Sequence, residues 1–430
     1  MEKKRLLVIS HNIVDASNNV GKTIISLLKR WPSHQVFSIY LRNEVRETMY
    51  CKESFMITDK DIMKNALIIS PKKCGRMISD KEKNNAHFGD AYAYRVGNRR
   101  YPIISLIRDI LWHKKSWKTS SFREWINKVS PDLILFVPND YTLAFEIADF
   151  VKDLTNAPMI TFFTDDSFYY GQKTGLIDSI RRKWLLKDGR IIVGKSEGLI
   201  CASSLMQREY KSIFGRDSKV FGNCVELTTD SVNHESDKYP FVFSYVGNLH
   251  SNRWQSLLEI GACLDLLNND LDTHCILNVY SASDLDNSVL KKLKAVNSID
   301  MKGAVPPSDV KMIQERSDAL VHIEAFDYKS KLSTRLSMST KIFEYMARNV
   351  PIFAYGPNDI SSITFLQEND FACVCTSKKT LKDSLKTFIT ENNLRSTLRE
   401  KSYEYAKLNF EESIISRAFD DFAKDIMMCR

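Results

Sequence analysis

The sequence predicts an α/β protein of two doubly wound domains, each built on a parallel sheet, and three observations support this expectation. The chain has 430 residues, which is more than a single hydrophobic core usually serves. Short apolar segments alternate with amphipathic helical patterns from end to end, which is typical of repeated βαβ units. The alternation stops once, in the polar stretch 226–240, and then restarts.

The composition is that of a globular protein and excludes several other classes. Apolar residues make up 43% of the chain and charged residues 27%, which is typical of a folded domain rather than a disordered one. No segment approaches the ~18 apolar residues of a membrane span, and the first residues lack the apolar core of a signal peptide. The nine cysteines are scattered and show no zinc-binding spacing. We therefore expect a cytoplasmic protein that has no structural disulfides and requires no metal or cofactor.

The individual strands are predicted from apolar runs that turn-forming or polar residues bound on either side. Helical patterns such as 21–31 and 140–154 lie between them. In the first half of the chain the predicted strands are 5–10, 35–41, 133–138, 159–164 and 198–203, and in the second half they are 241–247, 274–281, 319–323 and 351–356.

The break at 226–240 predicts an N-terminal Rossmann-like domain over residues 1–228 and a C-terminal one over residues 238–408. Parallel α/β sheets bind ligands at the carboxyl ends of their strands. Two such domains that face each other would therefore place their binding edges at a common cleft.

A short loop after the first strand, ASNNVGKT at 16–23, raises the question of a P-loop. Gly21, Lys22 and Thr23 match the end of that motif, but alanine stands where its first glycine is usual. The alternative is a turn that opens the first helix and faces the cleft. There Asn19 and Gly21 would allow close approach of a ligand and Lys22 would add charge.

Four stretches, read together, resemble nucleotide-sugar glycosyltransferases of the GT-B fold, close to glycosyltransferase family 4 in bacterial capsule and polysaccharide synthesis. These stretches are EGLICASSLMQREYKSIFGRDSKVFGNCVEL, FVFSYVGNLHSNRWQSLLEI, SDALVHIEAFDYKSKLSTRLSMSTKIFEYMARNVPIFAYGP and YAKLNFEESIISRAFDDFAKDI. The resemblance is strong over residues 195–430 and thin over residues 42–130. It implies that 1–228 binds the acceptor, that 238–408 binds the donor, and that the terminal helix in 409–430 returns to the N-terminal domain.

Transfer from a sugar nucleotide builds negative charge on a diphosphate leaving group, so the donor site needs cations or backbone amides. The resemblance places Gly247 and Arg253 after the first strand of the C-terminal domain in this role. Ser339 or Thr340 would cap a helix that begins near Lys341, with its amides toward the anion. Glu344 resembles the family glutamate that binds the ribose, on a helix we expect to be well buried.

The chain departs from the family at one carboxylate. Many members carry a second glutamate eight positions before the one at 344, where this sequence has Leu336. Either Glu324 serves in its place near the transferred sugar or the role is absent.

The acceptor side is predicted at the end of the strand 159–164. Asp165 and Asp166 are candidates to orient or deprotonate an acceptor hydroxyl, and the alternative is that one of them caps the following segment.

The net charge of +8 is concentrated in one segment. Between Ala91 and Lys128, nine basic residues stand against Asp109 and Glu124. Within it, residues 99–118 place Ile103, Leu106, Ile107, Ile110 and Leu111 on one helical face, with Trp112 and Trp117 on the flanks. This pattern indicates either a helix on an anionic membrane surface or a core-facing helix with a solvated basic rim. Since no nucleic-acid-binding module is recognised, we do not expect nucleic acid as a partner.

The sequence and the resemblance together predict a cytoplasmic glycosyltransferase of hexosyltransferase type, peripheral on the inner face of the membrane if 99–118 binds lipid. It would move a sugar from a UDP- or GDP-sugar to a saccharide or lipid-linked acceptor, with retention. Two alternatives stay open: a GT-B-like sugar-nucleotide epimerase or hydrolase, and an inactive nucleotide-binding partner protein.

Overall fold

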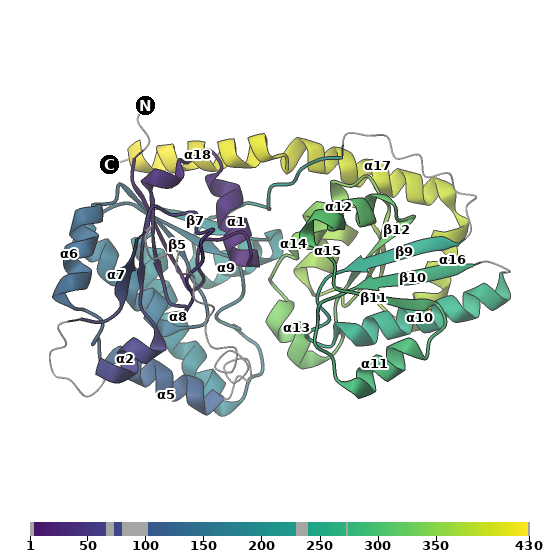
Figure 1. Ribbon diagram of the computed structural model, residues 1–430, viewed down its shortest axis with the longest axis horizontal. Helices are drawn as coiled ribbons and strands as arrows, with labels where there is room; N and C mark the ends of the chain where they lie inside the picture. The colour runs from purple at the N-terminus through teal and green to yellow at the C-terminus, as the bar shows by residue number, and fades with distance from the viewer. Residues whose placement is uncertain (1–3, 66–72, 80–101, 229–239, 272–273, 429–430) are drawn as a thin grey trace. The chain divides into compact units, whose positions relative to one another are not determined.

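The computed structural model describes residues 4–65, 73–79, 102–228, 240–271 and 274–428. The chain divides into two compact units, which are described separately (Figure 1). Unit 1 comprises Met1–Asn223 and Ile415–Arg430, and unit 2 comprises Cys224–Ile414. Most of the predicted break, residues 229–239, and the start of the predicted basic helix, residues 99–101, lie outside the described residues.

Unit 1 is built on an eight-stranded sheet within the described residues, and all neighbouring strands are parallel except β3 and β4. Strand β1 lies between β2 and β5, so the strand order reverses direction at β1 and β5. In sheet order the strands are β4 (Arg76–Ile78), β3 (Glu53–Met56), β2 (Val36–Tyr40), β1 (Leu6–Ser10), β5 (Leu133–Val137), β6 (Met159–Phe163), β7 (Gly198–Cys201) and β8 (Lys219–Val220).

The helices of unit 1 pack around this sheet, and α1, α6, α7 and α9 have a side-chain cap at the start or a left-handed residue at the end. For example, Ser203 accepts a hydrogen bond from the Met206 amide at the start of α9, and Gly215 ends that helix in the left-handed conformation. The helices are α1 (Asn19–Leu28), α2 (Asp59–Asn65), α5 (Pro102–His113), α6 (Ser120–Val129), α7 (Thr142–Thr155), α8 (Leu176–Lys195) and α9 (Ser204–Phe214), with a short 3-10 helix, η1 (Ser33–Gln35).

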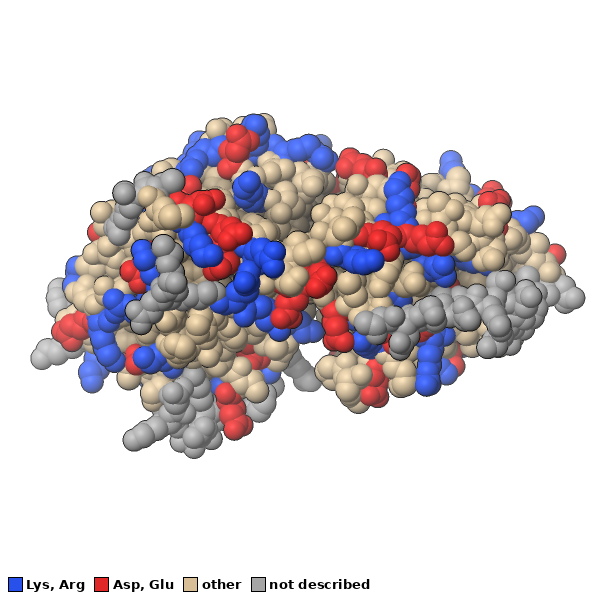
Figure 2. All heavy atoms as spheres, turned by 90° about the horizontal axis from the view of Figure 1, so that it is seen from above, with Lys and Arg blue, Asp and Glu red and all other residues tan. Residues whose placement is uncertain are grey.

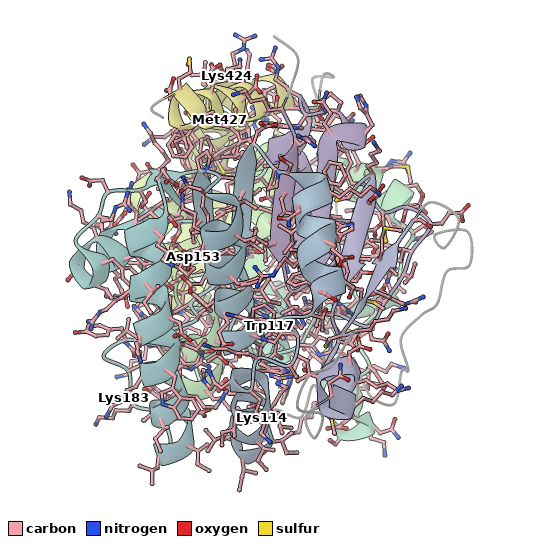
Figure 3. All side chains as sticks on the ribbon, turned by 90° about the vertical axis from the view of Figure 1, so that its left-hand side faces the viewer. Lys114, Trp117, Asp153, Lys183, Lys424 and Met427 are labelled. Carbon is pink, nitrogen blue, oxygen red and sulfur yellow. The ribbon has the colours of Figure 1, made fainter. Side chains whose placement is uncertain are left out.

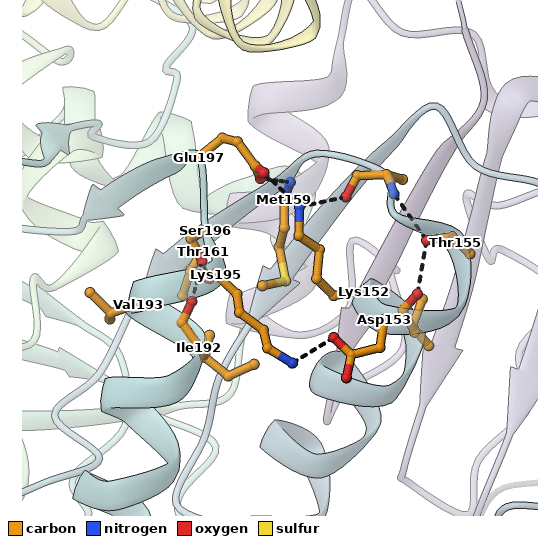
Figure 4. A network of polar contacts seen from close by, with 12 residues as sticks. Lys152, Asp153, Thr155, Met159, Thr161, Ile192, Val193, Lys195, Ser196 and Glu197 are labelled. Atoms are coloured by element: carbon orange, nitrogen blue, oxygen red, sulfur yellow. Dashed lines mark hydrogen bonds and ion pairs between the residues drawn. The ribbon is translucent and has the colours of Figure 1, made fainter. Parts of the chain in front are cut away.

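A polar network fixes the register where β6 begins (Figure 4). The Glu197 carboxylate accepts hydrogen bonds from the Met159 amide and from Lys152 Nζ, both at 2.6 Å. Lys152 also donates to the Ala157 carbonyl at 3.0 Å. These contacts connect α7, and the residue that precedes β7, to the amino end of β6.

Unit 2 is built on a six-stranded sheet whose described strands are all parallel. Here the strand order reverses direction between β9 and β12, which are neighbours. In sheet order the strands are β11 (Ile299–Gly303), β10 (Cys275–Tyr280), β9 (Phe241–Val246), β12 (Ala319–Ile323), β13 (Ile352–Tyr355) and β14 (Cys373–Cys375).

The core of unit 2 lies between this sheet and its helices, and it includes Phe243, Leu257, Leu277, Val321 and Phe353. The helices are α10 (Arg253–Asp270), α11 (Asn287–Lys294), α12 (Pro307–Glu315), α13 (Tyr328–Thr334), α14 (Thr340–Met346), α15 (Ser361–Glu368), α16 (Leu381–Thr390) and α17 (Asn392–Asn409), with a short 3-10 helix, η2 (Lys378–Thr380).

The last helix, α18 (Glu412–Met428), begins in unit 2, and from Ile415 it belongs to unit 1. Its apolar face buries Ile415, Phe419, Ala423 and Ile426, and the Phe419 ring lies 6.4 Å from that of Phe221. The chain therefore crosses between the two units twice.

All nine strands predicted from the sequence are present, to within one or two residues at each end. The prediction missed β3, β4, β8, β11 and β14. Of these, β4, β8, β11 and β14 are the edge strands of their sheets, where a strand needs fewer apolar residues, and β3 lies next to an edge.

Candidate functional site

The candidate site of unit 2 lies at the carboxyl ends of β9 and β12, where the strand order reverses. At such a reversal point, the connections that follow the two neighbouring strands run in opposite directions. The loops there diverge and leave space for a ligand. The loop after β9 leads to Arg253, and Glu324 directly follows β12. These two residues are 71 positions apart in sequence and are brought together by the pairing of the two strands.

Arg253 and Glu324 form a nearly buried ion pair. Arg253 Nε donates to one carboxylate oxygen at 3.2 Å, and Nη2 donates to both oxygens at 2.9 and 3.0 Å. The side chains are 15% and 3% exposed, respectively. Because the Arg253 side chain keeps some exposure, a charged guanidinium is held at the edge of the site with its orientation fixed.

Neighbouring groups hold this pair in place. Ser256 donates to the Glu324 carbonyl at 2.8 Å, and Arg253 Nη1 donates to the Asn248 side chain at 3.2 Å. Burial would lower the pKa of Arg253, but the negative charge of Glu324 outweighs it and raises the pKa. The guanidinium therefore stays charged.

His322 lies beneath the ion pair on β12 and is fully buried. Its Nε2 is 3.0 Å from Ser362 Oγ and 3.8 Å from a Glu324 oxygen, and its Nδ1 has no hydrogen-bond partner among the described residues. Burial holds the pKa of His322 well below its usual range, and the charges of Lys341 and Arg253 lower it further. His322 is therefore a neutral neighbour of Glu324.

Lys341, in the first turn of α14, adds a second cation to this edge. Its Nζ donates to Tyr245 Oη at 3.1 Å and lies 4.6 Å from the centre of the Tyr245 ring. Gly247 makes room for it, since a Cβ there would be 2.5 Å from Lys341 Nζ, and its φ of +157° suits glycine. Gly247, Arg253, Glu324 and Lys341 thus gather at one edge of the sheet.

The remaining predicted donor residues lie at the start of α14 or within it. Ser339 occupies the N-cap position and Thr340 is the first helical residue, but the Ser339 side chain makes no capping hydrogen bond, so that expectation is corrected. Glu344 is half-buried, although its neighbours Ile342 and Phe343 are buried. Leu336 is 1% exposed, so an apolar side chain fills its position.

In unit 1, Asp165 and Asp166 follow β6 and have different environments. Asp165 is exposed, whereas Asp166 is buried and its Oδ1 accepts bonds from the amides of Phe168 and Tyr169 and from the Tyr210 hydroxyl. Burial, followed by the charge of Asp166, raises the pKa of Tyr210 well above its usual range. Asp166 therefore organises the loop after β6, as the capping alternative expected.

The loop at 16–23 does not have the form of a phosphate-binding loop. Asn18 caps α1 by accepting a bond from the Gly21 amide at 2.7 Å, and Thr23 Oγ1 donates to the Asn19 carbonyl at 3.0 Å. A Cβ at Gly21 would be 2.1 Å from the Asp15 carbonyl oxygen, so this glycine serves close packing within the chain. Lys22 is exposed. The loop therefore opens α1 as a turn, which is the first part of the alternative expected from the sequence.

Several polar residues near the strand reversals were not predicted from the sequence. In unit 2 these are Asn248, His322 and the hydroxyl of Tyr245, which donates to the Asn248 carbonyl. In unit 1, Asn139 follows β5, and its Nδ2 is buried without a hydrogen-bond partner within the described ranges. Their position directly after or within predicted strands is the signal that could have identified them.

No group of three or more His, Cys, Asp and Glu side chains in the described part of the chain could hold a metal ion. Of the helices in these same residues, none is both long enough and apolar enough to span a bilayer.

Comparison with solved structures identifies the fold. The chain aligns over 98% of its length with 100% of the Anabaena protein HepE, solved in complex with UDP, at a TM-score of 0.64 and 11% identity. It aligns over 99% with 100% of sucrose-phosphate synthase from Thermosynechococcus elongatus, at a TM-score of 0.63 and 10% identity. It also aligns over 99% with 100% of a trehalose 6-phosphate synthase from Burkholderia multivorans, at 0.61 and 10%.

No protein-family model matches the sequence, and a search of the curated proteins found no match. At 10–11% identity the structural likeness shows the fold and not the activity. The chain therefore has the GT-B fold of two doubly wound units that the sequence predicts.

Proposed function

We propose that this protein is a retaining glycosyltransferase that uses a nucleotide-diphosphate sugar, with UDP as the nucleotide. The observation that carries the proposal is the ion-paired Arg253 beside Lys341 at the strand reversal of unit 2. Among structures of the same fold, HepE is solved with UDP and with UDP-glucose. That observation favours UDP over GDP and a hexose as the transferred sugar.

In this proposal the two cations receive the leaving diphosphate. As the bond between the sugar and the phosphate breaks, negative charge grows on the phosphate oxygens, and preorganised cations stabilise it without reorganisation. Arg253 supplies planar N–H donors and Lys341 supplies a compact charge. Gly247 keeps the loop after β9 close to Lys341. The backbone amides of Ser339 and Thr340, at the start of α14, would contribute further donors.

The carboxylates have separate proposed roles. Glu344 is the candidate to accept hydrogen bonds from the ribose. Glu324 uses both oxygens to hold Arg253, so we assign it a positioning role rather than direct contact with the sugar. Its location, one residue past β12, would allow it to remain close to the reacting centre.

For the acceptor, unit 1 offers Asp165. This carboxylate is exposed after β6, whereas Asp166 is engaged with backbone amides and acts as its support. Asn19, Gly21 and Lys22 remain candidates for a loop that faces the substrates. The acceptor we propose is a saccharide or lipid-linked saccharide of a surface polysaccharide such as a capsule, used on the cytoplasmic side of a membrane.

One observation favours a second candidate, a nucleotide-binding protein without transferase activity. Leu336 is buried where many family 4 enzymes resembling this chain have a glutamate, so unit 2 lacks that carboxylate. Such a protein would bind UDP and leave UDP-sugars intact.

Titration calorimetry with UDP tests the proposal. We expect Arg253→Gln to weaken UDP binding by about 10- to 100-fold, because a charged hydrogen bond is lost. Arg316→Gln is the matched control, since Arg316 is exposed at the amino end of β12, away from the carboxyl edge. Equal UDP affinity in the two variants would contradict the role of Arg253. UDP binding without release of UDP from any UDP-sugar, with or without acceptor saccharides, would favour the inactive alternative.

A further inference from the structure

Helix α5 of unit 1 presents isoleucine to solvent and charge to the interior. Ile103, Ile104, Ile107 and Ile110 are 56%, 55%, 54% and 48% exposed. The opposite face of the helix buries Asp109 completely. A helix that served only to cover a core would have the reverse arrangement. Of the two alternatives that the sequence left open for this helix, the core-facing one is therefore wrong, and Leu106 and Leu111 are half-buried at the borders of the exposed face.

Strong interactions hold α5 in this orientation. Asp109 accepts a bond from Arg181 of α8 at 2.7 Å, and the pair is almost fully buried. The Arg108 guanidinium lies 3.7 Å from the centre of the Tyr141 ring and 4.6 Å from that of Trp112, which is itself buried. Rotation of the helix would break this buried ion pair at a high cost, so exposure of the isoleucines is a fixed property of the fold.

The neighbouring helix α8 extends the apolar surface. Asp109 meets Arg181, and His113 meets Trp184 one turn later, so α5 and α8 run in the same direction. Near its start, α8 exposes Leu176 (80%) and Ile180. Helix α2 also packs against α5 and exposes Met63. Seven exposed large apolar side chains therefore come from α5 and from the two helices that pack against it, α2 and α8: Met63, Ile103, Ile104, Ile107, Ile110, Leu176 and Ile180. We name them the α5 apolar surface.

On both helices, lysines follow the exposed apolar residues along the same face. On α5 the spacing Ile103, Ile107, Ile110 leads on to Lys114 just past the helix, and on α8 the spacing Leu176, Ile180 leads to Lys183 and Lys187. All of these lysines are exposed. In Figure 3, Lys114 and Lys183 both lie in the lower part of the view, on neighbouring helices. Apolar side chains thus precede cationic ones along both helices.

Cationic side chains border this surface, and three carboxylates beside it lie against arginines. Asp59 pairs with Arg108, and Asp109 and Asp178 both face Arg181. On the face shown in Figure 2, by contrast, acidic and basic side chains are interspersed. Exposed isoleucines bordered by lysines are complementary to a bilayer with apolar chains below and anionic headgroups above.

We propose that the α5 apolar surface inserts into the interface of an anionic lipid bilayer, with Lys114, Lys183 and Lys187 at the level of the headgroups. The inference rests on the proposed function for its purpose, which is to bring unit 1 to a lipid-linked saccharide acceptor. The binding itself depends only on the surface described here and is measured without any substrate.

Sedimentation with lipid vesicles tests this proposal. We expect the full chain to bind vesicles that contain phosphatidylglycerol and to bind weakly to vesicles of phosphatidylcholine alone. The double variant Ile107→Ser/Ile110→Ser should bind the anionic vesicles at least about tenfold more weakly, because two apolar side chains no longer leave water. Leu266→Ser is the control, since Leu266 is 52% exposed on α10 of unit 2. Lys114→Glu/Lys183→Glu should lose binding at low salt, where headgroup attraction is strongest.

UDP affinity, measured in the same variants, separates this inference from the proposed function. We expect it to be unchanged in all of them, which also shows that they are folded. If the protein binds vesicles but has no affinity for UDP, the proposed function is excluded and the inference of a membrane-binding surface still holds. Equal vesicle binding by the isoleucine and control variants would overturn the inference. The inference would also be overturned if the protein had no affinity for anionic vesicles and instead formed, in sedimentation equilibrium, a dimer that the isoleucine substitutions abolish.

Discussion

At the scale of single residues, the Arg253–Glu324 ion pair is the contact on which the candidate site depends most. The sequence identified both residues as candidates, on the resemblance, but not that they bind each other. Their contact requires β9 and β12 to be neighbours, and strand order is not encoded in any local pattern. The same limit applies to Lys341 and Tyr245, which are 96 residues apart.

Removal of one partner of the ion pair should strongly lower the free energy of unfolding. Glu324→Gln leaves the Arg253 charge largely buried without a carboxylate, and we expect urea unfolding to show a loss of about 3 kcal/mol. The double variant Arg253→Met/Glu324→Gln should lose less than the sum of the single changes, because no unpaired charge remains. Strictly additive losses in this cycle would mean that the pair does not act as a unit.

Asp188 on α8 should make the stability of the protein depend on pH. Burial, and then the nearby Glu146 carboxylate, raise the pKa of Asp188 to about 6 from 3.8. Because the folded state holds this proton more tightly, the ionised carboxylate destabilises the folded state. The loss grows as pH rises through about 4 to 6 and is complete above that range.

We therefore expect Asp188→Asn to raise the melting temperature at pH 8, less so at pH 5, and not near pH 4. The variant removes the ionisation that the folded state resists. Asp217→Asn is the control, since that carboxylate is 85% exposed in a surface pair with Lys211. A gain that is the same at every pH would show that Asp188 acts through packing rather than through its charge.

At the scale of elements, the sequence predicted the central strands and missed the marginal ones for a physical reason. Strands such as β1 and β5 are buried on both faces and read as continuous apolar runs. At the sheet margins, β8 is exposed and β11 mixes polar and apolar residues, so neither produces a clear signal. For helix α5 the sequence left two alternatives open, because no local pattern shows that a buried ion pair, and not its isoleucines, faces the interior.

The first helix, α1, gives a prediction about the loop that precedes it. Gly21→Ala would bring a Cβ within 2.1 Å of the Asp15 carbonyl oxygen, so the backbone must separate. We expect a loss of about 1–3 kcal/mol in thermal or urea unfolding. Lys22→Ala, at the next and exposed position, should change stability by less than about 0.5 kcal/mol and leave UDP affinity unchanged. Loss of nucleotide binding on replacement of Lys22 alone would instead restore the P-loop interpretation.

At the scale of the whole molecule, the order of apolar segments was sufficient to predict a two-unit α/β fold, because each βαβ repeat carries its own local signal. What each unit binds is not encoded in that order. In our proposal the charge distribution assigns nucleotide binding to unit 2. This assignment predicts which segments of the chain exchange their amide hydrogens more slowly when UDP is bound.

Hydrogen exchange of the full chain with and without UDP measures where the nucleotide is held. A ligand that binds only the native state raises the free energy of every opening that releases it. At a free ligand concentration of a hundred times the dissociation constant, this increase is about 2.7 kcal/mol. We expect slower exchange in the loop 247–253 and around 339–345, where openings would release Arg253 or Lys341 from the diphosphate. Residues 16–23 form their hydrogen bonds within the loop and with Asp15, so UDP alone should not protect them. Protection centred on 16–23, with 247–253 unaffected, would move the nucleotide to unit 1 and exclude the site at β9 and β12.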